Sequence, residues 1–218
     1  MSNVRGLKKL RAVVAAGVAL LVISGASYAA NLMPDYSFEN LDLQTITAGG
    51  TTNLGDGYMR FVNLNGHGTL QVISDAQDGN RAIKVTKTTD DLVQVDLDSN
   101  PTASWIPVQA GQTYIMSFWA RTDDSTWMQL QVNWRDDWYA AGSQYPGWAL
   151  TSTWTQYSCT YVAPSNADLL QLAWLVGAPG SMVIDNVSVQ QVVPEPSSIL
   201  AIFSALAGFA GVAGLRRK

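Results

Sequence analysis

The chain has only one cysteine and one histidine among its 218 residues. A single cysteine, Cys159, excludes an intrachain disulfide, and we interpret it as a buried or half-buried thiol in the strand-like run 154–162. Zinc sites of the usual His/Cys type need several such ligands and are excluded as well. A Ser-His-Asp triad would depend on His67, which lies in a Gly-rich turn with no nucleophile-elbow motif to accompany it.

Positive charge is scarce between the two ends of the chain. There are 13 Lys and Arg residues against 17 Asp and Glu residues, but four of the cations precede residue 12 and three end the chain. Residues 30–193 therefore hold six cations and 16 acidic residues, a net charge of −10. Nucleic-acid binding needs clustered Lys and Arg, so this composition argues against it. The high net charge suits a soluble protein outside a bacterial membrane, because it opposes self-association.

Long apolar runs are confined to the two ends of the chain. At the start, four basic residues precede the apolar run 12–23 and the mostly small residues 24–29. This order predicts a secretory signal peptide over residues 1–29, with a helical apolar part. Ser27 and Ala29 supply the small residues at positions −3 and −1, so we expect signal peptidase to cleave after Ala29.

The C-terminus carries a tail in three parts. A Pro-Glu-Pro motif is followed by the uncharged run 197–215 and then by three cations, residues 216–218. As a transmembrane helix the run would rise about 28 Å, close to the hydrocarbon thickness of a bilayer, and the cations would stay on the cytoplasmic side. The residues of this motif are Pro194, Glu195, Pro196, Arg216, Arg217 and Lys218.

The order of these three parts resembles the PEP-CTERM sorting signal of Gram-negative bacteria. The resemblance implies that an exosortase recognises the tail and cuts it near Pro194-Glu195-Pro196. The precursor would then lie in the inner membrane, and the mature protein at the cell surface or in the extracellular matrix. An ordinary C-terminal anchor behind a Pro-rich hinge is the alternative.

Short segments rich in β-forming residues fill the central part of the chain. They cover residues 81–86, 91–97, 113–121, 127–134, 153–162, 169–176 and 182–189. Turn signals such as Asp78-Gly79 and Pro179-Gly180 separate them, and no ten-residue segment shows helical periodicity. The pattern predicts an all-β domain over residues 30–190, an antiparallel β-sandwich or jelly roll, with a linker over 191–196.

Four motifs of this central part resemble the carbohydrate-binding modules of families 4, 9 and 22. They are NLMPDYSFE at 31–39, DGNRAIKV at 78–85, VQAGQTYIMSFWAR at 108–121 and IDNVSV at 184–189. Those modules are galactose-binding-domain-like jelly rolls. The resemblance therefore implies a non-catalytic sandwich that binds a polysaccharide.

The same resemblance implies a structural calcium ion. In the resembled modules, Ca²⁺ often joins the N-terminal segment to the last strand. The matching carboxylates are Glu39 and Asp185, with Asp78 as a third. Hard oxygen ligands from distant segments suit Ca²⁺. The alternative is that these carboxylates only bond to the backbone of turns.

Strand alternation separates a predicted core from a predicted polar surface. The residues that oppose the apolar sets are Gln94, Asp96, Trp119, Arg121, Trp127, Gln129, Gln131, Asn133 and Gln171. We expect them to share one continuous sheet face, where aromatic rings would stack on sugars and amides would bond to hydroxyls. An ordinary solvated outer face is the alternative, although exposed tryptophans favour binding.

Two further features complete the expectations. The aromatic stretch 134–148 indicates a long loop, either a binding rim or a cap on the core. Adjacent aspartates at 90/91, 123/124 and 136/137 would suit a glycosidase only if two carboxylates stood at a fixed separation, and such turn pairs are usually solvated. We therefore expect an exported glycan-binding protein that is not an enzyme, with a structural or adhesive matrix protein as the alternative.

Overall fold

All regular structure that the computed structural model describes is β. It describes residues 26–33, 37–54, 59–97, 105–137 and 139–194, which contain fifteen strands and no helix. The predicted all-β class and antiparallel sandwich are confirmed. Both predicted terminal helices and the tail from Glu195 onward lie outside the described residues. Within those residues, no helix has the length and apolarity needed to cross a membrane.

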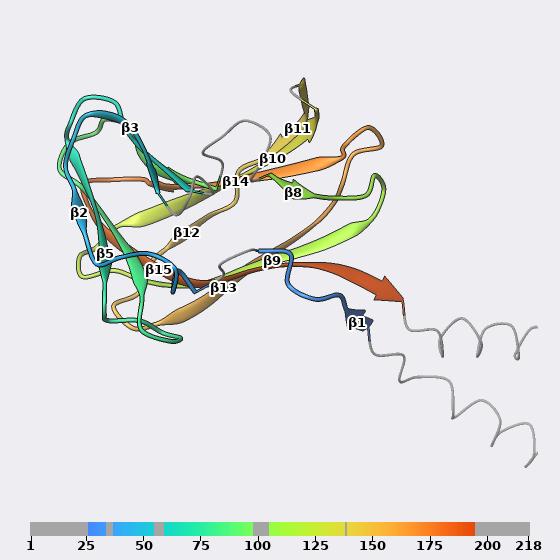
Figure 1. The fold of residues 1–218 in the computed structure, drawn as a ribbon, viewed down its shortest axis with the longest axis horizontal. Coiled ribbons are helices and arrows are strands. Elements are labelled where there is room, and N and C mark those ends of the chain that lie inside the picture. Colours follow the sequence, from blue (N-terminus) through green and yellow to red (C-terminus); the bar gives the residue numbers. More distant parts are fainter. Residues whose placement is uncertain (1–25, 34–36, 55–58, 98–104, 138, 195–218) are drawn as a thin grey trace, which may run out of the picture. The chain divides into compact units, whose positions relative to one another are not determined.

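The strands form two antiparallel sheets that lie as two layers (Figure 1). The seven-stranded sheet has the order β13 (Thr155–Val162), β9 (Thr113–Arg121), β15 (Gly180–Pro194), β6 (Ala82–Lys87), β5 (Gly68–Ile73) and β2 (Thr45–Ile46), with β1 (Ala26–Tyr28) paired to β15. The eight-stranded sheet has the order β11 (Tyr139–Gln144), β10 (Trp127–Asp136), β14 (Leu169–Val176), β7 (Val93–Asp96), β4 (Met59–Asn63) and β3 (Gly50–Leu54). In that sheet β12 (Gly147–Ala149) pairs with β10, and β8 (Ile106–Pro107) pairs with β14.

Alternate residues of the long strands point into one core between the sheets. Strand β9 buries Tyr114, Met116, Phe118 and Ala120, and β10 buries Met128, Leu130, Val132 and Trp134. Phe118 joins the two layers, because its ring meets that of Trp174 on β14 edge-on, with centroids 5.9 Å apart. The intervening residues of the same strands face outward, which fixes where a binding surface lies.

Contacts divide the chain into two units, Ala30–Gln191 and the two ends Met1–Ala29 with Val192–Lys218. Within the second unit, β1 pairs antiparallel with the end of β15, with Ala26 opposite Pro194 and Tyr28 opposite Val192. Strand β15 thus continues through Pro194. The expected linker over 191–196 stays a prediction; its residues 191–194 lie in this strand.

The expected long loop at 134–148 is also wrong, because β11 and β12 form most of it. Trp148 packs on Phe118 and Tyr157, with ring centroids 5.6 and 5.8 Å away, so it caps the core. Tyr139 and Tyr145 are exposed instead. Trp138 lies outside the described residues.

The start of the larger unit is bonded to β15. The Asn31 side chain accepts the Val189 N–H at 2.9 Å and donates to the Val187 carbonyl at 3.0 Å. The Leu32 N–H donates to the Val189 carbonyl at 2.9 Å. These bonds follow a bulge at Asn186, whose positive φ of 47° asparagine tolerates.

Candidate functional site

The outward side of the eight-stranded sheet gathers most of the predicted polar residues. Strand register places Asn133 opposite Gln171, Gln131 opposite Ala173, and Ala173 opposite Asp96. Asp96 in turn lies opposite Arg60 on β4. We call this surface the polar face; it consists of Arg60, Gln94, Asp96, Trp105, Trp127, Gln129, Gln131, Asn133, Arg135 and Gln171.

A buried carboxylate holds the middle of the polar face. Asp96 is only 1% exposed, and its Oδ2 accepts hydrogen bonds from Arg60 Nε at 3.1 Å and Nη2 at 2.5 Å. Its other oxygen accepts a hydrogen bond from Gln94 Nε2 at 2.7 Å. A buried charge paired and bonded in this way is fixed in place, so Arg60 and Gln94 hold set orientations.

Two glutamines of β10 offer free amides beside this network. Gln129 and Gln131 are half-buried and make no side-chain hydrogen bond to any described residue. Next to them, Asn133 accepts a hydrogen bond from the Ser143 hydroxyl at 2.8 Å, which leaves its amide nitrogen as a donor. The row can therefore donate to and accept from the hydroxyls of a ligand.

Trp127 stands at one end of the polar face and is 44% exposed. One side of its ring lies against Gly177, since a Cβ on that glycine would come within 2.1 Å of the ring atoms Cδ2 and Cε2. The Gly177 N–H donates to the Trp127 carbonyl at 2.8 Å, which fixes the two backbones together. An exposed ring supported in this way can stack on the C–H face of a sugar.

Sequence reasoning was wrong about Trp119 and Arg121, which do not share this face. Strand β9 belongs to the seven-stranded sheet, where Trp119 lies opposite Asp185 and Gln156. The Arg121 guanidinium forms an ion pair with Asp75 at 2.6 Å and lies over the Trp154 ring, 5.4 Å from its centroid. These contacts bind the Arg121 side chain to residues that flank strands of the seven-stranded sheet.

Three residues of the polar face escaped prediction. Arg135 continues the alternation of β10 two residues beyond Asn133, and the length of the strand was underestimated. Trp105 directly precedes β8, a strand of two residues that is too short to show a period. Arg60 lies in β4, within the Gly-, Asn- and Thr-rich stretch where no strand was predicted.

The proposed calcium ligands are engaged with the backbone of one turn. Glu39 Oε1 accepts the N–H groups of Asn80 and Arg81 at 2.7 and 2.8 Å. Asp185 Oδ2 accepts those of Gln77 and Asp78 at 2.7 and 2.8 Å. This is the alternative that the sequence left open. N–H donors aimed at the carboxylates do not fit a cation there, and the described residues hold no group of three or more His, Cys, Asp or Glu suited to a metal. Calcium binding is untested, and from this geometry we expect none at these two carboxylates.

The two carboxylates differ in their electrostatics. Asp185 is fully buried, and burial raises its pKa to about 6, with the nearby charge of Asp78 adding to the rise against three backbone N–H groups. Glu39 lies nearer the surface, and the Asn80 N–H lowers its pKa. Asp185 is thus the group of this pair whose charge the fold disfavours.

The aspartate pairs do not combine into a catalytic pair of carboxylates. Asp91 bonds with His67 and accepts from Thr89 at 2.7 Å; the bond with His67 is the main cause that lowers the pKa of Asp91 to about 2. Asp123 is an ion-pair partner of Lys84 at 2.5 Å and also of Arg121. Asp91, Asp123 and Asp124 are thus each bonded to neighbouring residues of their own.

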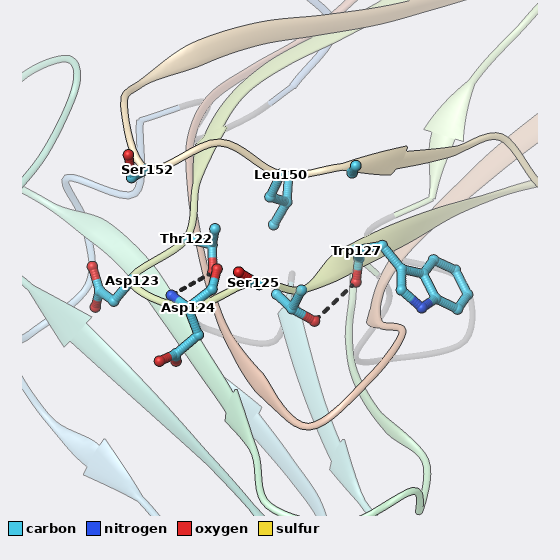
Figure 2. A pocket seen from close by; sticks show the side chains of 9 residues that line it. Thr122, Asp123, Asp124, Ser125, Trp127, Leu150 and Ser152 are labelled. Atoms are coloured by element: carbon cyan, nitrogen blue, oxygen red, sulfur yellow. Dashed lines mark hydrogen bonds between the residues drawn. The ribbon is translucent and has the colours of Figure 1, made fainter.

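A pocket of about 570 Å³ lies at the β9–β10 turn, beyond the Trp127 end of the polar face. Figure 2 shows Asp123, Asp124 and Ser125 on one side, Leu150 and Ser152 on the other, and the Trp127 ring turned away from the aspartates. The Asp124 carboxylate accepts the Ser181 hydroxyl at 3.1 Å. The pocket therefore holds no free acid–base pair, and we place the candidate site on the polar face.

Comparison with known proteins agrees with the architecture. Residues 30–180 match the family described as "Carbohydrate binding domain", CBM_4_9. The chain belongs to this family. No curated protein sequence matches this chain.

Solved structures with a similar fold include the following three. The enzymatically active domain of bacteriophage CBA120 tailspike protein 4 has a TM-score of 0.52 and 15% identity over 74% of this chain, which spans about a fifth (21%) of that protein. A structure described as "CBM4 structure and function" has a TM-score of 0.47 and 19% identity, and covers 73% of this chain and 99% of its own. The CBM22-1 xylan-binding domain of Paenibacillus barcinonensis Xyn10C has a TM-score of 0.45 and 15% identity, covering 70% and 96%. At these identities the likeness concerns the fold alone.

Proposed function

We propose that this carbohydrate-binding-domain protein binds a polysaccharide through the polar face of its eight-stranded sheet. The observation that carries the proposal is Trp127: its ring rests on Gly177 and remains 44% exposed beside the free amides of Gln129 and Gln131. An aromatic platform next to hydrogen-bonding amides matches both the apolar and the hydroxyl-bearing surfaces of a sugar chain. The family match over residues 30–180 supports the same ligand class.

The test is retardation of the full chain in native gels that contain neutral or acidic polysaccharides. Trp127→Ala should weaken retardation several-fold, because stacking on one aromatic ring contributes on the order of 1 kcal/mol. Trp119→Ala is the matched control, since it removes an indole from the other sheet. Retardation of neither the wild type nor the control by any polysaccharide would refute binding and favour the structural or adhesive matrix role.

The proposal includes export and sorting through the chain ends. The basic and apolar order of residues 1–29 supports removal by signal peptidase after Ala29, and Pro194-Glu195-Pro196 with the apolar run 197–215 supports sorting by an exosortase. The mature protein would then act at the cell surface or in the extracellular matrix. Mass spectrometry of the protein secreted by cells with and without exosortase tests this, and a secreted form that retains residues 197–215 would refute tail removal.

A further inference from the structure

Two cations of the domain, Lys87 and Arg135, have no carboxylate partner among the described residues, and of the two only Arg135 lies on the polar face. Residues 30–193 contain six Lys and Arg residues. Arg60, Lys84 and Arg121 form ion pairs with aspartates. Lys87 donates to the Val176 carbonyl. Arg81 donates to the Leu41 and Asn80 carbonyls and lies near Glu39.

Among the described residues, the groups that hold Arg135 in position are neutral. Its Nη2 donates to Gln171 Oε1 at 2.7 Å, and its guanidinium carbon lies 5.6 Å from the centroid of the Trp105 ring. Trp105 is itself only 8% exposed, so the stacked pair is set into the surface. Stacking and one hydrogen bond fix the plane of the guanidinium and preorganise its remaining donors.

The Arg135 guanidinium retains unused bonding capacity. Its Nε is buried and has no hydrogen-bond partner among the described residues, and Nη1 makes no bond to them either. A buried donor without an acceptor is costly, and more so on a charged group, so a native structure rarely keeps one without a reason. A ligand acceptor at this guanidinium would supply what the protein does not.

The charge of the polar face points to the kind of acceptor. Its single carboxylate, Asp96, is already committed to Arg60, which leaves Arg135 as a net positive charge. The domain carries −10, and Asp136 and Asp168 lie near the Arg135 backbone, but no described carboxylate is bonded to the Arg135 guanidinium, whose unused donors remain open to an acceptor. A guanidinium fork matches the planar oxygens of a carboxylate better than a neutral hydroxyl.

We propose that Arg135, stacked on Trp105 and bonded to Gln171, makes the polar face selective for glycans that bear carboxylates, such as chains of uronic acid. The inference rests on the proposed function and specifies its ligand class. Gln94, Gln129 and Gln131 then bond to hydroxyls, while Arg135 binds the carboxylate of one sugar unit.

The experiment compares polygalacturonate with its methyl ester, which has the same backbone but no free carboxylates, in affinity gels of the full chain. The wild type should bind the acid about tenfold more tightly than the ester, the effect of one charge-assisted hydrogen bond. Arg135→Gln should lose that tenfold preference, so that it binds acid and ester with similar affinities. Lys84→Gln, which removes one cation from the other sheet, should change neither affinity.

Further arms keep the outcomes separable. Added salt should weaken binding to the acid and leave binding to the ester unchanged. Dextran sulfate against dextran tests sulfate esters as the source of negative charge, and a preference there without one for the uronate would overturn the carboxylate assignment. Equal affinities for acid and ester, or equal losses of both in Arg135→Gln, would overturn the inference and leave glycan binding intact. No retardation by any glycan, neutral or acidic, would overturn the proposed function as well.

Discussion

Replacing Gly177 by alanine would displace one aromatic ring without straining the backbone. The added Cβ would meet Cδ2 and Cε2 of Trp127 at 2.1 Å and Cζ2 at 2.5 Å. Gly177 is not among the glycines with positive φ, so its backbone accepts a side chain. Ordinary contact begins near 3.4 Å, so the ring must move by more than about 1 Å.

Two opposing terms set the size of the effect. Overpacking of this kind costs about 1–3 kcal/mol. Alanine also restricts the unfolded chain, which stabilises the folded state by about 0.4–1 kcal/mol. Gly177→Ala should therefore lower the free energy of unfolding by about 1–2 kcal/mol. In a Trp127→Ala background the collision is gone, and the same substitution should become stabilising by about 0.5 kcal/mol.

Urea unfolding of the full chain, the two single variants and the double variant measures this reversal. Polysaccharide binding by Gly177→Ala should fall toward that of Trp127→Ala, because the ring persists but its position does not. An equal change in stability from Gly177→Ala in both backgrounds would mean that the two residues do not interact. The supported ring at the centre of the proposed function would then be refuted.

Three other predictions concern the rest of the domain. Burial raises the pKa of Asp185 to about 6 from a usual 3.8, so ionisation of this carboxyl opposes folding. The free energy of unfolding, measured with urea, should therefore fall by up to about 3 kcal/mol as pH rises through this range. Asp185→Asn should remove this pH dependence, and an unchanged dependence would contradict the shift. Chelator should leave the melting temperature unchanged, because Glu39 and Asp185 already accept backbone N–H groups; a rise on adding calcium that Asp185→Asn abolishes would instead show the calcium site. Trp148→Ala should lower the free energy of unfolding by about 2–4 kcal/mol, because it uncovers Phe118. Tyr145→Ala, at an exposed position, should lower it by less than about 0.5 kcal/mol. Similar losses for both variants in urea unfolding would contradict the role of Trp148 as a cap on the core.

Strand alternation allowed some elements to be predicted to the residue. Strands β9 and β14 have the predicted bounds: buried and outward residues alternate throughout β9, whereas β14 buries residues 170–174 in succession and was found from its run of β-forming residues. The region of β3 to β5 went unpredicted, since β4 buries three residues in succession and the stretch around it is rich in Gly, Asn and Thr. Period and propensity both fail in such a strand.

Membership of a sheet could not be predicted from local pattern. Trp119 and Trp127 both point away from the core, and alternation alone gives them the same status. The turn between β9 and β10 passes from one sheet to the other, so the two rings lie on different sheets. Only the pairing of strands distant in sequence decides which sheet a strand joins. This pairing places Trp119 and Arg121 on the seven-stranded sheet. The other predicted residues share the eight-stranded sheet: Gln94, Asp96, Gln129, Gln131, Asn133 and Gln171.

Strand β15 also has a mechanical meaning for a protein tethered at its C-terminal side. It lies between β9 and β6, and its hydrogen bonds to them run across the strand. A force applied at Gln191 along the strand axis would load many of these bonds in shear at once, whereas a force across the strand would break them one after another. The Asn31 bonds to Val187 and Val189 add resistance at the same end. If the proposed tail anchors the precursor and the polar face binds a polymer, tension between the two would be borne by a central strand.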